Sequence, residues 1–200
     1  MNHEVVLVLD FGGQYSKFIA RRIREGNVYS EVVPYDIDVE RVKEIDPVGI
    51  VFSGGPNSVY DEGAPEIDDE IFELGIPILG ICYGMQLMCH ELDGVVKRAE
   101  NKEYGRSMLE VKTAEGIFAG LDDELECWMS HADRVEEVPT GFEIIGATDN
   151  SPAAAVGNSE QGFYGVQFHP EVVHTPRGEE IIDNFLYQVC DCSGDWTTAN

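Results

Sequence analysis

A cysteine flanked by small residues stands where a buried strand should turn into a helix. Pro77–Ile81 is a short apolar run typical of a buried strand, and the helix formers Met85–Met88 follow it. Cys82 lies between Gly80 and Gly84, which is the G-x-nucleophile-x-G pattern of a tight elbow that exposes its central side chain. A helix N-terminus directly after the cysteine favours the thiolate, the reactive form of the side chain. The pattern indicates a cysteine nucleophile, with a buried structural cysteine as the alternative.

A histidine and a glutamate one residue apart could serve that nucleophile. His169 and Glu171 follow the apolar run 163–168, which predicts a strand, and Pro170 between them favours an extended backbone. Side chains at i and i+2 of an extended segment share a face. The Glu171 carboxylate can therefore accept from one ring nitrogen while the other nitrogen reaches the thiol, as a nucleophile–base–orienter triad requires. The alternative is a structural histidine at a strand end.

A glycine pair, Gly54-Gly55, could offer backbone amides near Cys82 and His169. Ser53-Gly54-Gly55-Pro56 ends another buried strand, and ligands gather at the carboxyl ends of parallel strands. The segment lacks the Gly-Lys-Ser/Thr continuation of a phosphate-binding loop. The N–H groups of Gly55 and of Tyr83, the residue after the nucleophile, would instead form an oxyanion hole. A plain turn is the alternative.

The order of the predicted elements indicates an α/β fold. Apolar runs alternate with segments of helical spacing, which predicts a parallel sheet with helices on both faces. Strands are expected at 5–9, 28–35, 48–52 and 77–81, and helices at 14–25, 39–45 and 67–74. Strand-like pieces follow at 107–111, 126–129, 142–147, 153–156 and 163–168, before a closing helix at 177–189. We expect an open, mostly parallel sheet flanked by helices with a smaller antiparallel edge sheet, in one domain over residues 1–190, and a polar, frayed tail at 191–200.

The composition limits the partners and the environment. Asp and Glu number 38 against 13 Lys and Arg, dispersed along a chain of net charge −25 that is 43% apolar. Acidic residues dispersed over an apolar core are typical of a halophilic protein, and an ordinary acidic protein is the alternative. The negative surface makes nucleic acid and anionic membranes poor partners. The sequence shows no secretory signal and no apolar run of membrane-spanning length, so we expect a cytoplasmic protein with five reduced cysteines.

Two smaller features receive a structural interpretation. Cys190-Asp191-Cys192 lacks a second ligand pair or a nearby histidine, so no metal site is expected there. Arg21, Arg22 and Arg24 form a basic cluster on the first predicted helix. We expect these arginines to extend along apolar surface or to pair with neighbouring carboxylates.

Several of these motifs together resemble the class I glutamine amidotransferases. The motifs are Gly80-Ile81-Cys82-Tyr83-Gly84-Met85-Gln86, Ser53-Gly54-Gly55-Pro56 and Gly165-Val166-Gln167-Phe168-His169-Pro170-Glu171. Further segments narrow the resemblance to the glutaminase part of the GMP synthase branch, namely Asp10-Phe11-Gly12-Gly13-Gln14-Tyr15, Trp128-Met129-Ser130-His131-Ala132-Asp133 and Val172-Val173-His174-Thr175. The resemblance covers the chain from about Val5 to Phe185 and implies a flavodoxin-like fold.

The resemblance also implies that the chain hydrolyses the side-chain amide of L-glutamine through a cysteinyl thioester. Cys82 would be the nucleophile, His169 the general base and then acid, and Glu171 the orienting carboxylate. Gly55 and Tyr83 would supply the oxyanion-hole amides. The residues that would help to hold the glutamine are Gln86, Ser130 and His131.

The resemblance further implies a partner that consumes the ammonia. The sequence contains no Ser-Gly-Gly-Val-Asp-Ser pyrophosphate loop, so we expect a separate ATP-pyrophosphatase (synthetase) subunit in a heterodimer. That subunit would use ATP and Mg²⁺ to convert XMP to GMP, while this chain would need no cofactor or metal. We expect a docking face at residues 128–133 and 173–175, with Asp133 and His174 as regulatory or interface candidates. A solvated Asp133 is the alternative.

Other functions stay open at this point. The same triad could belong to a stand-alone γ-glutamyl hydrolase or peptidase, or to the amidotransferase subunit of another biosynthetic pathway. Relatives that make anthranilate usually carry Asn-Pro-Gly-Pro where this chain has Ser53-Gly54-Gly55-Pro56, which speaks against that branch. A non-catalytic regulatory subunit is a third possibility, and the intact Cys82, His169 and Glu171 argue against it.

Overall fold

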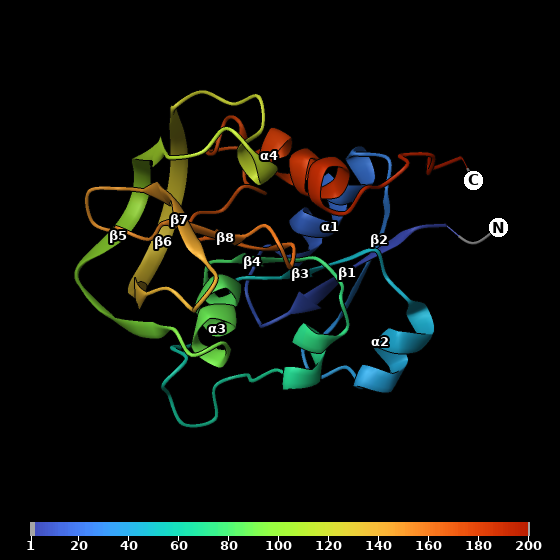
Figure 1. Ribbon diagram of the computed structural model, residues 1–200, viewed down its shortest axis with the longest axis horizontal. Coiled ribbons are helices and arrows are strands. Elements are labelled where there is room, and N and C mark those ends of the chain that lie inside the picture. The colour runs from blue at the N-terminus through green and yellow to red at the C-terminus, as the bar shows by residue number, and fades with distance from the viewer. Residues whose placement is uncertain (1–2, 200) are drawn as a thin grey trace.

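A computed structural model describes residues 3–199 and shows one mixed sheet with helices on both faces (Figure 1). Its strands are β1 (Val5–Asp10), β2 (Tyr29–Pro34), β3 (Gly49–Phe52), β4 (Ile78–Ile81), β5 (Val95–Val111), β6 (Glu124–Glu137), β7 (Glu143–Ala147), β8 (Ala155–Asn158) and β9 (Phe163–Val166). Its helices are α1 (Ser16–Glu25), α2 (Val39–Ile45), α3 (Tyr83–Glu91) and α4 (Gly178–Asn184), with the π-helical turn η3 (Phe185–Val189) and the 3₁₀ turns η1 (Asp69–Glu73) and η2 (Gly116–Phe118). In this part of the chain no helix is long and apolar enough to cross a membrane.

The strand order confirms the predicted fold class. The sheet runs β2-β1-β3-β4-β9-β8-β7-β5-β6, and the pairs from β2 to β9 are parallel. The pairs from β9 to β6 are antiparallel. The antiparallel strands thus continue the same sheet instead of forming a separate edge sheet, because β9 pairs with β4 on one side and with β8 on the other.

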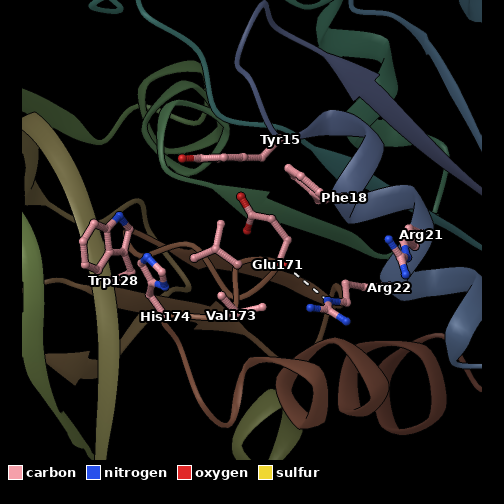
Figure 2. A pocket seen from close by; sticks show the side chains of 9 residues that line it. Tyr15, Phe18, Arg21, Arg22, Trp128, Glu171, Val173 and His174 are labelled. Atoms are coloured by element: carbon pink, nitrogen blue, oxygen red, sulfur yellow. Dashed lines mark hydrogen bonds between the residues drawn. The ribbon is translucent and has the colours of Figure 1, made fainter.

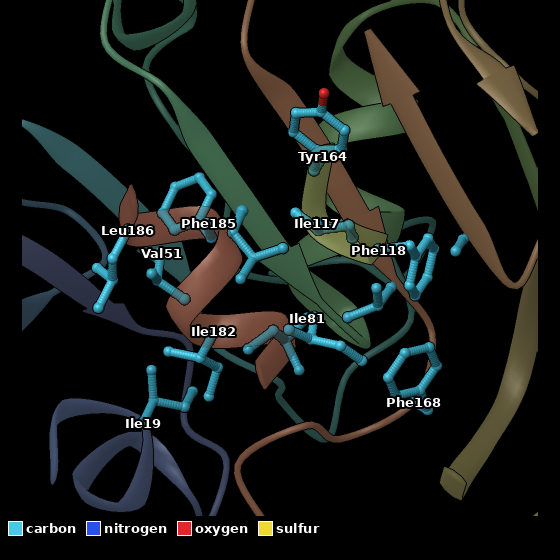
Figure 3. Packing of buried hydrophobic residues seen from close by; sticks show 14 of the residues in the cluster. Ile19, Val51, Ile81, Ile117, Phe118, Tyr164, Phe168, Ile182, Phe185 and Leu186 are labelled. Carbon is cyan, nitrogen blue, oxygen red and sulfur yellow. The ribbon is translucent and has the colours of Figure 1, made fainter. Parts of the chain in front are cut away.

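The central strands are buried on both faces, which explains their continuous apolar sequence. In β1, Val6 and Val8 face one hydrophobic cluster, while Leu7 and Leu9 face the other. The first cluster lies under α1, α4 and η3, where Ile19, Ile182, Phe185 and Leu186 pack together (Figure 3). The second lies under α2 and α3 on the opposite face of the sheet (Figure 1). The predicted two-faced burial is therefore confirmed.

Two predicted elements differ in extent from the observed ones. The helix expected at 67–74 is only the turn η1 (Asp69–Glu73). The short strands expected at 107–111 and 126–129 are parts of the long hairpin β5–β6, whose pairing continues to Val95 and Glu137 across irregular register. Hydrogen bonding between the two strands extends each of them through polar residues that show no strand pattern on their own.

The C-terminal segment is more ordered than the frayed tail expected at 191–200. Cys192 and Trp196 are buried, and the backbone N–H of Trp196 donates to the Asn27 carbonyl at 3.2 Å. The indole packs against the Tyr29 ring with centroids 5.8 Å apart. Burial of this large apolar side chain fixes the backbone around it. Residue 200, at the end of the predicted tail, lies outside the described residues.

The elbow between β4 and α3 depends on two glycines. A Cβ on Gly84 would lie 2.4 Å from the Phe52 carbonyl oxygen, and one on Gly80 would lie 2.7 Å from the Gly84 carbonyl oxygen. Both contacts involve backbone atoms that cannot rotate away. The glycines therefore allow α3 to begin directly against the end of the sheet.

We predict that Gly84→Ala destabilises the protein by at least about 2 kcal/mol. Alanine favours a helix by about 1 kcal/mol over glycine, but overpacking against backbone typically costs about 1–3 kcal/mol or more and should dominate here. Urea unfolding measures the difference. His90→Ala, at an exposed position of the same helix, should change stability by only a few tenths of a kcal/mol. A Gly84→Ala variant as stable as His90→Ala would contradict the close-approach explanation.

Candidate active site

The backbone of Cys82 has the unusual conformation that the elbow pattern predicts. Its φ is 52° and its ψ is −110°, a left-handed conformation for a residue that carries a side chain. Its N–H donates to the Val166 carbonyl of β9 at 2.8 Å, and its own carbonyl accepts from Gln86 N at 3.1 Å in the first turn of α3. The strained residue is thus held by hydrogen bonds on both sides, at the carboxyl end of β4 and the N-terminus of α3.

His169 and Glu171 lie on one face of the segment after β9, as predicted. His169 Nδ1 is 2.7 Å from Glu171 Oε1, and both side chains are buried. Thr175 Oγ1 donates to the His169 carbonyl at 2.7 Å, while the His169 N–H donates to the Trp128 carbonyl at 3.0 Å. These bonds fix the ring. Since Nδ1 is taken by the carboxylate, Nε2 is the nitrogen left for Cys82.

The surroundings of His169 favour its charged form. Burial disfavours an imidazolium, but hydrogen bonds with Cys82 and Glu171 outweigh this effect and raise the pKa of His169 to about 10. The Tyr15 ring meets the imidazole edge-on with centroids 5.4 Å apart. The structure thus brings the three predicted triad residues together, with the imidazole between the sulfur and the carboxylate.

Two neighbouring cavities, of about 260 and 250 Å³, meet at the nucleophile. Cys82, Gly55 and Ser130 line both of them, and Tyr83 lines the second. The loop after β3 presses against the triad, because a Cβ on Gly54 would lie 3.2 Å from His169 Cε1 and 3.6 Å from Cys82 Cβ. Both predicted oxyanion-hole residues therefore border the space in front of the sulfur.

The predicted glutamine-binding residues have unequal positions. Gln86 is buried, and its Nε2 donates to the Asp133 carbonyl and to Gln167 Oε1, each at 3.0 Å. Ser130 is exposed, and its carbonyl accepts from Cys82 Sγ at 3.6 Å. Gln86, Ser130 and His131 all line the second cavity.

Both ring nitrogens of His131 have partners within the protein. Its Nδ1 is 2.7 Å from the Asp133 carbonyl oxygen and its Nε2 is 3.1 Å from Glu103 Oε1. Burial would raise the pKa of Glu103, but hydrogen bonds from His131 and Ser151 outweigh it and lower that pKa to about 2. The His131 side chain therefore supports the cavity wall through buried contacts with Glu103 and with the Asp133 carbonyl.

Asp133, a regulatory or interface candidate, is buried and therefore offers little surface of its own to a partner. Segment 128–133 is part of strand β6, and the Asp133 side chain points to the loop after β3. The hydroxyls of Ser58 and Tyr60 both donate to its carboxylate. The solvated alternative is wrong, because only 6% of Asp133 is exposed. The residue ties the glycine-bearing loop to β6.

His174, the other interface candidate, is exposed at the edge of a third cavity. This pocket of about 420 Å³ lies next to the triad and is lined by Tyr15, Phe18, Trp128, Val173 and His174 (Figure 2). The His174 ring meets Trp128 edge-on with centroids 4.5 Å apart. Glu171 also lines this pocket, so one wall of it belongs to the triad.

The basic cluster on α1 has the structural role that we predicted. Arg21 pairs with Glu25 at 3.0 Å, and Arg22 pairs with Glu25 at 2.8 Å and with Glu179 at 2.7 Å. Arg22 Nε also donates to the Glu171 carbonyl at 3.3 Å (Figure 2). Arg24 donates to the Ser30 carbonyl at 2.7 Å and lies over the Tyr29 ring. The arginines therefore fasten α1 to the sheet and to the segment after β9.

Sequence reasoning missed several residues of this site. Gln167 is fully buried, and its Nε2 donates to Cys82 Sγ at 3.5 Å. Its position two residues before His169 in an extended segment was a usable signal, because such side chains share a face. Glu103, Ser58 and Tyr60 gave no such signal, since their partners lie far away in the sequence.

Comparison with known proteins agrees with this geometry. The family model for class-I glutamine amidotransferases matches residues 7–189. The glutamine-hydrolyzing GMP synthase of Heliobacterium modesticaldum is 56% identical over 99% of this chain, and that of Natranaerobius thermophilus is 54% identical over 100%. The chain covers only 39% of the length of each of these relatives.

Solved structures show the same fold. A crystal structure from Thermoplasma acidophilum, of a protein provisionally assigned as one of the subunits of GMP synthase, is 31% identical and has a TM-score of 0.83 over 94% of both chains. A glutamine amidotransferase from Thermotoga maritima has a TM-score of 0.76 at 19% identity, over 94% of this chain and 99% of that one. The chain belongs to the class-I glutamine amidotransferase family.

Proposed function

We propose that this chain is the glutamine-hydrolysing part of a GMP synthase. It would release ammonia from the side chain of L-glutamine for a synthetase that converts XMP to GMP. The observation that carries the proposal is the buried Cys82–His169–Glu171 arrangement at the junction of two cavities. The identity of 52–57% to GMP synthases supports this branch of the family.

The first half of the reaction uses the sulfur, the imidazolium and the backbone amides of Gly55 and Tyr83. Cys82 Sγ, as thiolate, attacks the side-chain carboxamide carbon of glutamine and forms a C–S bond. The negative charge that develops on the carboxamide oxygen is met by the N–H groups of Gly55 and Tyr83, each worth about 3 kcal/mol in the transition state. His169 gives its Nε2 proton to the nitrogen, which leaves as ammonia. The product is a γ-glutamyl thioester on Cys82.

The second half regenerates the enzyme. Neutral His169 accepts a proton from water, and the resulting hydroxide adds to the thioester carbon. The C–S bond then breaks, so that glutamate leaves and the sulfur returns as thiolate. Glu171 holds the imidazole in one orientation during both proton transfers and stabilises its charged form. Among residues 3–199 no cluster of three or more His, Cys, Asp or Glu side chains is arranged to hold a metal ion. We propose, separately, that the synthetase uses ATP and Mg²⁺ in its own active site.

The partner, in this proposal, is a separate synthetase subunit that docks over the pocket beside the triad. Val173 is 74% exposed and Phe18 is 49% exposed, and both line this one pocket, so they give it an apolar border for a partner to cover. Glu171 lines the pocket and also orients His169, and its buried Oε2 has no hydrogen-bond partner within the described part of the chain. A donor group of the partner that reaches Oε2 would change the field at His169. Docking and hydrolysis would then be coupled.

The proposal is tested by measuring ammonia release from glutamine with and without the candidate synthetase, ATP and XMP, at low and at molar KCl. We expect glutamine-dependent GMP formation by the mixture and none with Cys82→Ala, while added ammonia still supports GMP formation. Glutamine hydrolysis without any transfer to XMP would favour a stand-alone hydrolase. A salt-adapted acidic shell, which we also propose, predicts higher activity at molar KCl.

Replacement of Glu171 by Gln should shift the pH dependence of glutamine hydrolysis. The carboxylate helps to hold the pKa of His169 at about 10, so its loss lowers that pKa towards the ordinary 6.5. Less imidazolium is then present at alkaline pH. We expect the alkaline limb of kcat/KM to move to lower pH and the rate at about pH 8 to fall at least ~10²-fold, as for other triads that lose their orienting carboxylate.

The pH dependence of stability tests the same Glu171→Gln variant independently of activity. Because the pKa of His169 is raised on folding, its contribution to stability is complete below pH 6.5 and is lost as pH rises towards about 10. Glu171→Gln should flatten this loss in urea unfolding. The control Glu179→Gln removes an exposed carboxylate that pairs with Arg22 and should leave both profiles unchanged. Identical profiles for wild type and Glu171→Gln would contradict the assigned role.

The docking face predicts a selective effect of Val173→Asp. A buried charge at the rim of the pocket should weaken binding of the synthetase at least about ten-fold, which corresponds to about 1.4 kcal/mol, and abolish its stimulation of glutamine hydrolysis. Basal hydrolysis should persist, because Val173 is exposed and outside the triad. Met108→Asp, at a 56% exposed position on β5, is the matched control. Equal binding by both variants would place the interface elsewhere.

A further inference from the structure

Gln167 is a buried polar residue beside the reacting sulfur, and the reaction described above leaves it without a role. It follows β9, two residues before His169, so both side chains lie on the face that meets Cys82. None of Gln167 is exposed, and its Nε2 is 3.5 Å from Cys82 Sγ. A buried amide next to a nucleophile cannot exchange its bond for one with bulk water.

The orientation of the Gln167 amide is set by a chain of hydrogen bonds. The Asp133 backbone carbonyl can only accept, so the Gln86 group that lies 3.0 Å from it is the donor Nε2. The same Nε2 also donates to Gln167 at 3.0 Å, which requires the oxygen of Gln167 on that side. The NH₂ group of Gln167 therefore faces the sulfur. The Asp133 carbonyl on β6 thus fixes the orientation of the Gln86 amide and, through it, that of Gln167. As a result, an N–H group of Gln167 faces the Cys82 sulfur.

A donor at this place distinguishes the two forms of Cys82. A thiol can donate, and the Ser130 carbonyl at 3.6 Å is an acceptor for it. A thiolate can only accept, and Gln167 Nε2 and the His169 ring are the donors around it. Hydrogen bonds to a charged partner are stronger than those to a neutral one, especially when buried. The Gln167 amide therefore favours the thiolate over the thiol.

We propose that Gln167 stabilises the Cys82 thiolate as a second donor beside His169. The inference rests on the proposed function, in which the sulfur is negative before attack and again after the C–S bond of the thioester breaks. At both stages the Gln167 N–H bonds to the charged sulfur and remains on nitrogen, so the amide moves no proton. His169 alone carries out the proton transfers. Gln86 then has two tasks, since it borders the glutamine cavity and also orients Gln167.

Site-resolved alkylation of Cys82 tests this inference without glutamine. Wild type, Gln167→Met and Gln167→Glu are treated with iodoacetamide across a pH series, and the Cys82 peptide is followed by mass spectrometry. Methionine keeps the length of the side chain and removes the donor. Glutamate keeps the acceptor for Gln86 and places a carboxylate beside the sulfur. Gln161→Met, at an exposed position, is the control.

We expect the pH midpoint of alkylation to rise by about one unit in Gln167→Met, which corresponds to an about ten-fold lower rate below the midpoint. The rise should be larger in Gln167→Glu and absent in Gln161→Met. The variants leave unchanged the other titratable side chains around the sulfur and its cavities, namely His169, Glu171, Tyr15, Tyr83, Tyr104, His131 and Asp133. In glutamine hydrolysis the variants should lower kcat more than they raise KM.

A purely structural role for Gln167 would change the urea midpoint or the KM for glutamine while the alkylation midpoint stays at the wild-type value. That result in both variants would overturn the inference and leave the proposed function intact. Failure of the proposed function has a different signature, because Cys82→Ala would then hydrolyse glutamine at the wild-type rate.

Discussion

The site depends on one backbone constraint, the left-handed conformation of Cys82 between β4 and α3. Such a conformation costs a residue with a side chain about 1–3 kcal/mol, and here the surrounding contacts hold it. Gly80 and Gly84 let α3 start against the end of the sheet, and the Cys82 N–H is bonded to β9. The sulfur is thereby fixed at the edge of the sheet where β3, β4 and β9 end. Gly55, Tyr83 and His169 follow the ends of these strands, while Tyr15 follows β1 and Ser130 lies on β6.

The two groups behind the sulfur, His169 and Glu171, are shielded from water. His169 and Glu171 are 5% and 1% exposed, and the pKa of His169 is raised because both of its ring contacts favour the imidazolium. His169 lines one of the cavities in front of Cys82, and Glu171 lines the pocket that contains Val173 (Figure 2). A partner that covers Val173 would therefore lie directly beside the carboxylate that orients the base. In the proposed complex, this arrangement would connect docking and hydrolysis over a short distance.

The triad could be predicted because its signals are local. A glycine-flanked cysteine after an apolar run and a histidine two residues from a glutamate are each visible within a short stretch of sequence, and the buried strands follow from their continuous apolar runs. Features that depend on distant partners could not be predicted. The extent of β5 is set by β6, the burial of Asp133 by Ser58 and Tyr60, and the order of the C-terminal segment by Tyr29. The contact between the His131 ring and Glu103 likewise depends on residues far apart in the sequence.

Covalent capture at Cys82 is the most direct measurement of the central claim. The protein is mixed with glutamine, alone and with the synthetase, quenched in acid within the turnover time, and digested for peptide mass spectrometry. The account predicts a γ-glutamyl adduct on the Cys82 peptide that hydroxylamine removes and that Cys82→Ala lacks. Release of ammonia at the full rate with no adduct on Cys82, or with an adduct on another cysteine, would contradict it.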